Sequence, residues 1–166
     1  MRRILNNSNE RYIPLSDELD AVSLYLELES MRLGNRFSYE IDVASNIDVK
    51  NIEVAPLIIQ PFVENAIIHG LVPKKENCFL KIEVSRAGEN RLLCIIEDNG
   101  VGRKYSEKMK EKNGLHKSYG MSITRRRLEM LSRISNDDFS VEIEDLYNER
   151  NEPSGTRVKI FLSYQD

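Results

Sequence analysis

Three short clusters in this sequence combine polar side chains with glycines in a way that could serve chemistry. They are Glu64-Asn65 with His69, the Asp-Asn-Gly-Val-Gly run at 98–102, and the Ser-Tyr-Gly-Met run at 118–121; a Gly155-Thr156 pair also precedes a strand-like segment. Glycines allow a ligand to approach the backbone, amides at a helix start can receive phosphate oxygens, and a carboxylate can accept from an exocyclic amine. Each cluster alone is an ordinary turn or helix end, but together they favour a nucleotide site.

Asparagine in the first cluster offers a hard oxygen ligand suited to Mg2+ that bridges phosphates. Asn65 and His69 lie one helical turn apart, while Gln60 and Glu64 form a second pair on a neighbouring face. The simpler interpretation is that these polar groups are satisfied internally, since each unsatisfied buried group costs about 1–3 kcal/mol. A P-loop is excluded, because no glycine-rich run ends in Gly-Lys-Ser or Gly-Lys-Thr.

A buried helix is expected to carry the first cluster. Its apolar residues leave almost no polar face: Ile58, Ile59, Phe62, Val63, Ala66, Ile67 and Ile68. Pro61 lacks an amide hydrogen, so we expect the regular helix to begin near it and Gly70 to end it.

A second, amphipathic helix is predicted over 16–33, where apolar residues recur at three- and four-residue steps until Gly34. This helix either covers the core or contributes to a helical dimer interface. Residues 1–14 are polar and weakly patterned, which is typical of a frayed end or linker.

Alternating segments predict strands at 37–43, 79–85, 92–98, 139–144 and 157–162. The segment 92–98 is the more apolar strand of a predicted hairpin and should be central. A third helix is predicted over 119–134, after a polar, mobile loop. The fold class is therefore α+β, a two-layer sandwich in which about three helices cover one face of a mixed, largely antiparallel sheet of about five strands.

Composition excludes several classes of protein. A chain of 166 residues with 40% hydrophobic residues and a net charge of −3 fits one globular domain and shows no basic surplus for nucleic acid. Cys78 and Cys94 lack metal-ligand spacing and are interpreted as buried thiols in a reducing compartment. Arg125-Arg126-Arg127 is either a solvated helix face or a docking surface.

No run in the sequence is long enough to span a bilayer, and the first residues lack the apolar core of a signal peptide. We therefore expect a domain of cytoplasmic character without membrane contact of its own.

The motifs resemble a known superfamily. The order and spacing of Glu64-Asn65-Ala66, 98–102, Gly120 and Gly155-Thr156 are similar to those of the ATP-binding domain of GHKL proteins, the Bergerat fold of gyrases, histidine kinases and MutL-like proteins. A longer match, from Ile13 through the 60–70 stretch, resembles the LytS-type sensor histidine kinases and covers nearly the whole chain.

This resemblance implies a two-component kinase that transfers the γ-phosphoryl group of ATP to a histidine outside this sequence. Residues 1–35 would be the remnant of a helical dimerisation and phosphoacceptor region with its linker helix, and 36–166 the ATP-binding catalytic domain. The implied partners are ATP with Mg2+, the phosphoacceptor helices of the same kinase dimer and a response regulator.

On the adenine side, the resemblance implies that Asp98 accepts from the adenine amino group. Gly100 and Gly102 would shape this side of the pocket, and Thr156 would lie near Asp98.

On the phosphate side, the resemblance implies that Asn65 ligates Mg2+ and that His69 faces the phosphates. Lys117 and Gly120 would belong to the lid and phosphate-binding turn. Glu64 and Asn65 would be catalytic, with Glu64 orienting Asn65 or assisting the phosphoryl acceptor.

Two features depart from the family pattern. Ser118 stands where the lid motif usually has a glycine, and neither His69 nor His116 has the Pro-His-Phe setting of a phosphoacceptor. Two alternatives follow: an ATPase or serine-directed kinase on the same fold, or a degenerate nucleotide-binding module used only for protein association.

Overall fold

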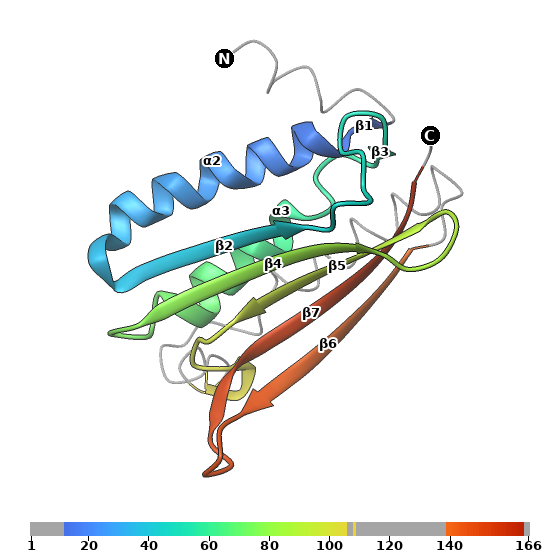
Figure 1. Ribbon diagram of the computed structural model, residues 1–166. Helices are drawn as coiled ribbons and strands as arrows, with labels where there is room; N and C mark the ends of the chain where they lie inside the picture. Colours follow the sequence, from blue (N-terminus) through green and yellow to red (C-terminus); the bar gives the residue numbers. More distant parts are fainter. Residues whose placement is uncertain (1–11, 106–107, 109–138, 165–166) are drawn as a thin grey trace.

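A five-stranded sheet forms the frame of the protein in the computed structural model, which describes residues 12–105, 108 and 139–164 (Figure 1). In sheet order the strands are β2 (Phe37–Val43), β4 (Cys78–Arg86), β5 (Arg91–Asp98), β7 (Pro153–Ser163) and β6 (Ser140–Tyr147). β2 and β4 are parallel, whereas the other three pairs are antiparallel. The predicted mixed, largely antiparallel sheet with 92–98 at its centre is confirmed.

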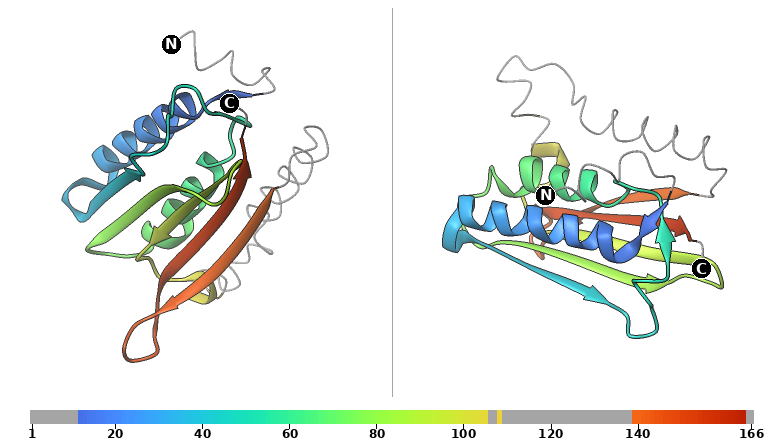
Figure 2. Two further views of the ribbon diagram at one scale, coloured as in Figure 1. Left: turned by 45° about the vertical axis from the view of Figure 1, so that its right-hand side comes forward. Right: turned by 90° about the horizontal axis from the view of Figure 1, so that it is seen from above.

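Two helical segments lie on one face of this sheet (Figure 2). α2 spans Leu15–Leu33 and is followed by a short 3-10 turn, Gly34–Arg36. α3 spans Gln60–Asn65, with Pro61 in its first turn as expected. The predicted third helix and most of the predicted mobile loop lie outside the described residues.

The chain after α3 differs from the prediction. The helix continues as a π-helical segment, Ala66–Leu71, in which the amide of Val72 donates to the carbonyl of Ile67 at 2.8 Å. Gly70 therefore does not end the helix, and its backbone is not left-handed. The expectation of a stop at Gly70 was wrong because this glycine serves a close contact with another strand, described below.

A small second sheet was also missed. β1 (Ile13–Pro14) pairs antiparallel with β3 (Glu53–Val54). The segment 1–14, which was expected to be a frayed end or linker, therefore ends in a short strand. Two-residue strands carry no periodicity that a sequence pattern can reveal. This pairing places the start of α2 beside the segment that leads to α3.

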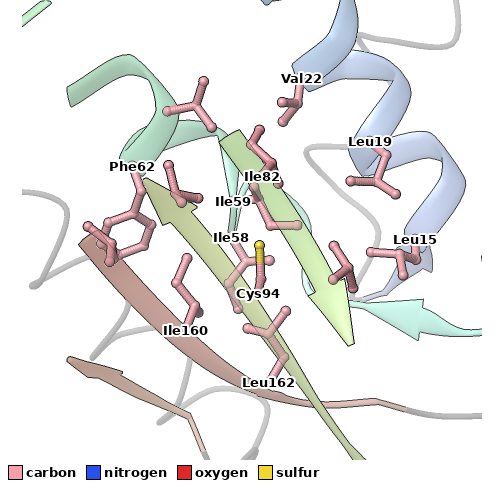
Figure 3. Close-up of a cluster of buried hydrophobic side chains, with 14 of the residues drawn as sticks. Leu15, Leu19, Val22, Ile58, Ile59, Phe62, Ile82, Cys94, Ile160 and Leu162 are labelled. Atoms are coloured by element: carbon pink, nitrogen blue, oxygen red, sulfur yellow. The ribbon is translucent and has the colours of Figure 1, made fainter. Parts of the chain in front are cut away.

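The hydrophobic core lies between the helices and the sheet. Figure 3 shows Leu19 and Val22 of α2 and Phe62 of α3 directed toward strand side chains such as Cys94 and Ile160. Each fully buried aliphatic side chain contributes about 1.5–3 kcal/mol to folding. Because α2 packs into the same core as α3, the prediction that this helix covers the core is confirmed. The predicted domain boundary between residues 35 and 36 stays a prediction.

The opposite face of the sheet carries charged pairs. Arg157 donates to Glu97 at 2.7 Å and to Glu144 at 3.3 Å, and Lys159 also pairs with Glu144. Because these pairs are partly exposed to solvent, they contribute little to stability. The layered arrangement puts all the predicted site residues that are described at or near the helix-covered side of the sheet.

Candidate functional site

Asp98 is a buried carboxylate at the end of the central strand β5. Its side chain is 3% exposed, and its Oδ1 accepts the backbone N–H of Gly100 at 2.8 Å. Burial raises the pKa of Asp98 to about 7, and the nearby charge of Glu97 acts in the same direction. The N–H groups of Gly100 and Thr156 and the charge of Lys74 oppose this rise. A carboxylate this costly to bury is typical of a functional site.

Glycines permit three close backbone contacts around Asp98. A Cβ at Gly100 would lie 2.4 Å from the carbonyl carbon of Gly70, and a Cβ at Gly70 would lie 2.7 Å from Oδ1 of Asp98. A Cβ at Gly155 would lie 1.9 Å from the carbonyl oxygen of Asp98. The amide of Val101 also donates to the carbonyl of Gly70 at 3.0 Å, which joins the end of the π-helical segment to the loop after β5.

Asn99 uses its side chain to hold this loop. Its Oδ1 accepts the amide of Phe79 at 2.8 Å, and its Nδ2 donates to the carbonyl of Asn77 at 2.8 Å. Lys74 Nζ donates to the carbonyl of Asn99 at 2.7 Å. Asn99 and Asp98 therefore have different roles. Asn99 fixes the loop after β5, whereas Asp98 lies against Gly70, Gly100 and Gly155.

Thr156 lies directly opposite Asp98 in the pairing of β5 with β7. Gly102 follows on the loop after β5, with a left-handed φ of 78° and its backbone close to Pro153 at the start of β7. The structure therefore brings together the four residues expected on the adenine side, namely Asp98, Gly100, Gly102 and Thr156.

The residues expected on the phosphate side are divided between faces of the α3 segment. Asn65 and His69 are half-buried, Asn65 as the last residue of α3 and His69 within the π-helical segment. Glu64 accepts from Nε2 of Gln60 at 2.9 Å, which confirms the predicted pairing of these two residues. Lys117 and Gly120 lie outside the described residues.

The carboxylate of Glu64 lies on the α2 side of α3. Burial raises the pKa of Tyr25 in α2 to about 12, with further contributions from the charges of Glu29 and Glu64. Glu64 is thus near α2 and apart from the Asp98 cluster.

Sequence reasoning missed two contributors. Gly70 was interpreted as a helix stop, although its function is to admit Asp98 and Gly100 to within contact distance. Glu18 is buried on the inner face of α2 at 1% exposure, and no function was assigned to it from the sequence. Its position three residues after Leu15 and four before Val22 was a signal, because it puts a charge on the apolar face of the helix.

Comparison with known proteins gives a consistent picture. The sensor protein LytS of Oceanobacillus iheyensis is 28% identical over 173 aligned residues, which cover 100% of this chain and 28% of the relative. The sensor histidine kinase/phosphatase LytS of Staphylococcus aureus strain MRSA252 is 35% identical over 101 residues, 61% of this chain and 17% of the relative. The chain is therefore similar in sequence to LytS-type sensor histidine kinases. It spans less than a third of the length of these LytS proteins, and no family model matches it.

Solved structures show the fold that this chain adopts. The catalytic domain of the histidine kinase ThkA superposes with a TM-score of 0.59 at 15% identity, covering 92% of this chain and 93% of that domain. The mycobacterial sensor histidine kinase MprB gives a TM-score of 0.59 at 14% identity, covering 93% and 97% of the two chains. ThkA solved in complex with the response regulator TrrA gives a TM-score of 0.57 at 18% identity, covering 98% of this chain and 45% of that one. The α+β sheet is therefore that of histidine kinase catalytic domains.

Among the helices of the described residues, none is long and apolar enough to cross a membrane.

Proposed function

We propose that this chain is the ATP-binding catalytic domain of a sensor histidine kinase, and that the whole protein transfers the γ-phosphoryl group of ATP to a histidine outside this sequence. The observation that carries the proposal is the buried Asp98 with Gly70 and Gly100 packed against it, on the fold of histidine kinase catalytic domains. A Cβ at Gly70 would collide with the carboxylate, and a Cβ at Gly100 would collide with the backbone of Gly70. The arrangement thus suits a flat base that donates an amino hydrogen to Asp98.

On the adenine side, we assign Asp98 the hydrogen bond from the exocyclic amine. Gly100 and Gly102 allow the base to lie against the backbone, and Thr156 is close enough in register to support Asp98. The amides of Gly100 and Thr156 already hold the carboxylate in place, so little reorganisation accompanies binding.

On the phosphate side, we assign Asn65 to Mg2+ and His69 to the phosphates. The described residues contain no cluster of three or more His, Cys, Asp or Glu side chains that could hold a metal ion. An asparagine oxygen fits Mg2+, which takes few protein ligands and completes its shell with phosphate oxygens and water. Bound Mg2+ would neutralise charge on the phosphates during transfer. Glu64, one position before Asn65, would orient it from the α2 side, and Lys117 and Gly120 would close over the phosphates.

The proposed partners are the phosphoacceptor helices of the same kinase dimer and a response regulator. The complex of ThkA with the response regulator TrrA supports the proposal of a response regulator as partner. The proposed setting is the cytoplasmic part of a membrane-anchored protein.

Titration calorimetry with a non-hydrolysable ATP analogue tests the proposal. Binding should strengthen with Mg2+, and Asp98→Asn should weaken it about tenfold or more, as expected for loss of a hydrogen bond to a charged group. Asp20→Asn makes the same change at an exposed position of α2 and should leave the affinity unchanged. Absence of binding at millimolar analogue, or equal affinity in Asp98→Asn, would favour the degenerate association module instead.

A further inference from the structure

Glu18 is a buried carboxylate that contacts the chain just before the helix of the candidate site. It lies in α2 at 1% exposure. Its Oε2 accepts the amide of Leu57 at 2.9 Å, and its Oε1 accepts the amides of Ile59 at 2.9 Å and Gln60 at 3.4 Å. One side chain therefore satisfies three backbone donors that are 39 to 42 residues away in sequence.

These donors belong to the N-terminal end of α3, which lacks a local side-chain cap. Ile59 occupies the cap position and makes no side-chain hydrogen bond to the helix, and Pro61 has no amide to offer. Helix starts expose amides that need acceptors, and an aspartate, asparagine, serine or threonine usually supplies one. Here a glutamate from another helix does so, and its negative charge also complements the positive end of the helix dipole.

The turn before α3 depends on the same carboxylate. Leu57 has a φ of 58°, in the left-handed region that side chains with a Cβ rarely adopt. This conformation turns the amide of Leu57 toward the carboxylate that also holds Ile59. Glu18 thus stabilises an unfavourable backbone conformation as well as the helix start.

The opposite end of the α3 segment is fixed independently. The carbonyl of Gly70 accepts from Val101, and Gly100 packs directly against Gly70. Asn65 lies between these two attachments, five residues after Gln60 and five before Gly70. The direction in which Asn65 projects is consequently set by Glu18 at one end and by the loop after β5 at the other.

We infer that Glu18 is a positioning residue for the phosphate side of the nucleotide site, which it serves by fixing the N-terminal end of α3 and hence the orientation of Asn65. The expected effect on ligand binding rests on the proposed function. The contact of Glu18 with α3 is independent of that function. The adenine side, attached to β5 and β7, is held separately from Glu18.

The test compares Glu18→Gln with the wild-type chain. The amide keeps the size of the carboxylate, but it replaces one acceptor oxygen with a donor and removes the charge. Glu27→Gln makes the same change at an exposed position of α2 and is the matched control. Affinities are measured for adenosine, which probes the Asp98 side, and for the magnesium complex of the non-hydrolysable ATP analogue.

Glu18→Gln should weaken binding of the magnesium complex about tenfold, because loss of hydrogen bonds to a charged group would leave α3 in its binding position only about a tenth of the time. Adenosine affinity should change less than about twofold, and Glu27→Gln should affect neither. An equal loss for both ligands would indicate general destabilisation and would overturn the inference, as would no loss for either. If Glu18→Gln fails to fold, Glu18→Asp, which keeps the charge but shortens the reach, takes its place.

Hydrogen exchange separates failure of this inference from failure of the proposed function. Without any ligand, Glu18→Gln should accelerate exchange of the α3 amides at 62–65 about tenfold while the β4 and β5 amides are unchanged. Were the wild-type chain to bind neither ligand, the proposed function would fail, and localised acceleration would still support the positioning of α3. Unchanged or uniformly accelerated exchange would overturn it.

Discussion

The buried carboxylate of Asp98 should make adenosine binding depend on pH near neutrality. Its pKa is about 7, and the proposed hydrogen bond from the adenine amine requires the ionised form. The ionised fraction then rises from about 9% at pH 6 to about 91% at pH 8. Because apparent affinity scales with the competent fraction, adenosine should bind about tenfold more tightly at pH 8 than at pH 6.

Adenosine is the suitable ligand because it carries no phosphate to titrate. Calorimetry at pH 6, 7 and 8 gives the dissociation constants, and buffers of different ionisation enthalpy should reveal proton release near pH 7. Histidine titrates in the same range, so a His69→Gln variant serves as a control that should keep the full pH dependence. Asp98→Asn should abolish it. Equal affinity of the wild-type chain at pH 6 and pH 8 would refute the reasoning.

Three further predictions concern stability and reactivity. The pKa of Asp98 is 3.8 in the unfolded chain and about 7 in the folded chain, a difference of about 3 units or about 4 kcal/mol. Because the folded chain binds this proton more tightly, the free energy of unfolding falls as the pH rises through this interval. Urea denaturation at pH 5 and pH 8 should show a smaller loss of stability in Asp98→Asn than in the wild type, and an equal loss would contradict the assigned burial. Gly100→Ala should lower the free energy of unfolding by about 1–3 kcal/mol, because its Cβ would meet the backbone of Gly70 at 2.4 Å; wild-type stability in urea would show that the contact can relax. Burial raises the pKa of Cys94 to about 12, so a thiol reagent should label it at pH 8 only after unfolding, and fast labelling of the folded chain would disprove its inaccessibility.

Much of the fold could be predicted from the sequence because its strands have one buried face. The predicted strand at 37–43 coincides with β2, and the predicted helix at 16–33 differs from α2 by one residue. In β2, burial alternates from Phe37 to Val43 without interruption, and the sequence alternates apolar and polar residues in the same register. Local periodicity therefore carried this information.

Contacts between distant segments could not be predicted in this way. The pairing of β1 with β3 joins residues about forty positions apart, and the bonds of Glu18 to the start of α3 do the same. Within the candidate site, the grouping of Asp98, Gly100 and Thr156 followed the family resemblance, but the fit of Gly70 against Asp98 required coordinates. The roles assigned to Glu64, Asn65 and His69 stay predictions.

The π-helical segment at 66–71 has a consequence for how the length of this chain can vary. A π turn accommodates one more residue than an α turn, so the segment is equivalent to a one-residue insertion in a helix. Deleting Ala66 would therefore permit a regular α-helix in which Asn65 and Gly70 keep about their present relative orientation, because the longer π turn and the shorter α turn rotate the chain by a similar angle. The same deletion within the regular helix α2 would instead rotate everything before it by about 100°. Single-residue deletions within 66–69 should therefore be tolerated better than single-residue deletions in α2.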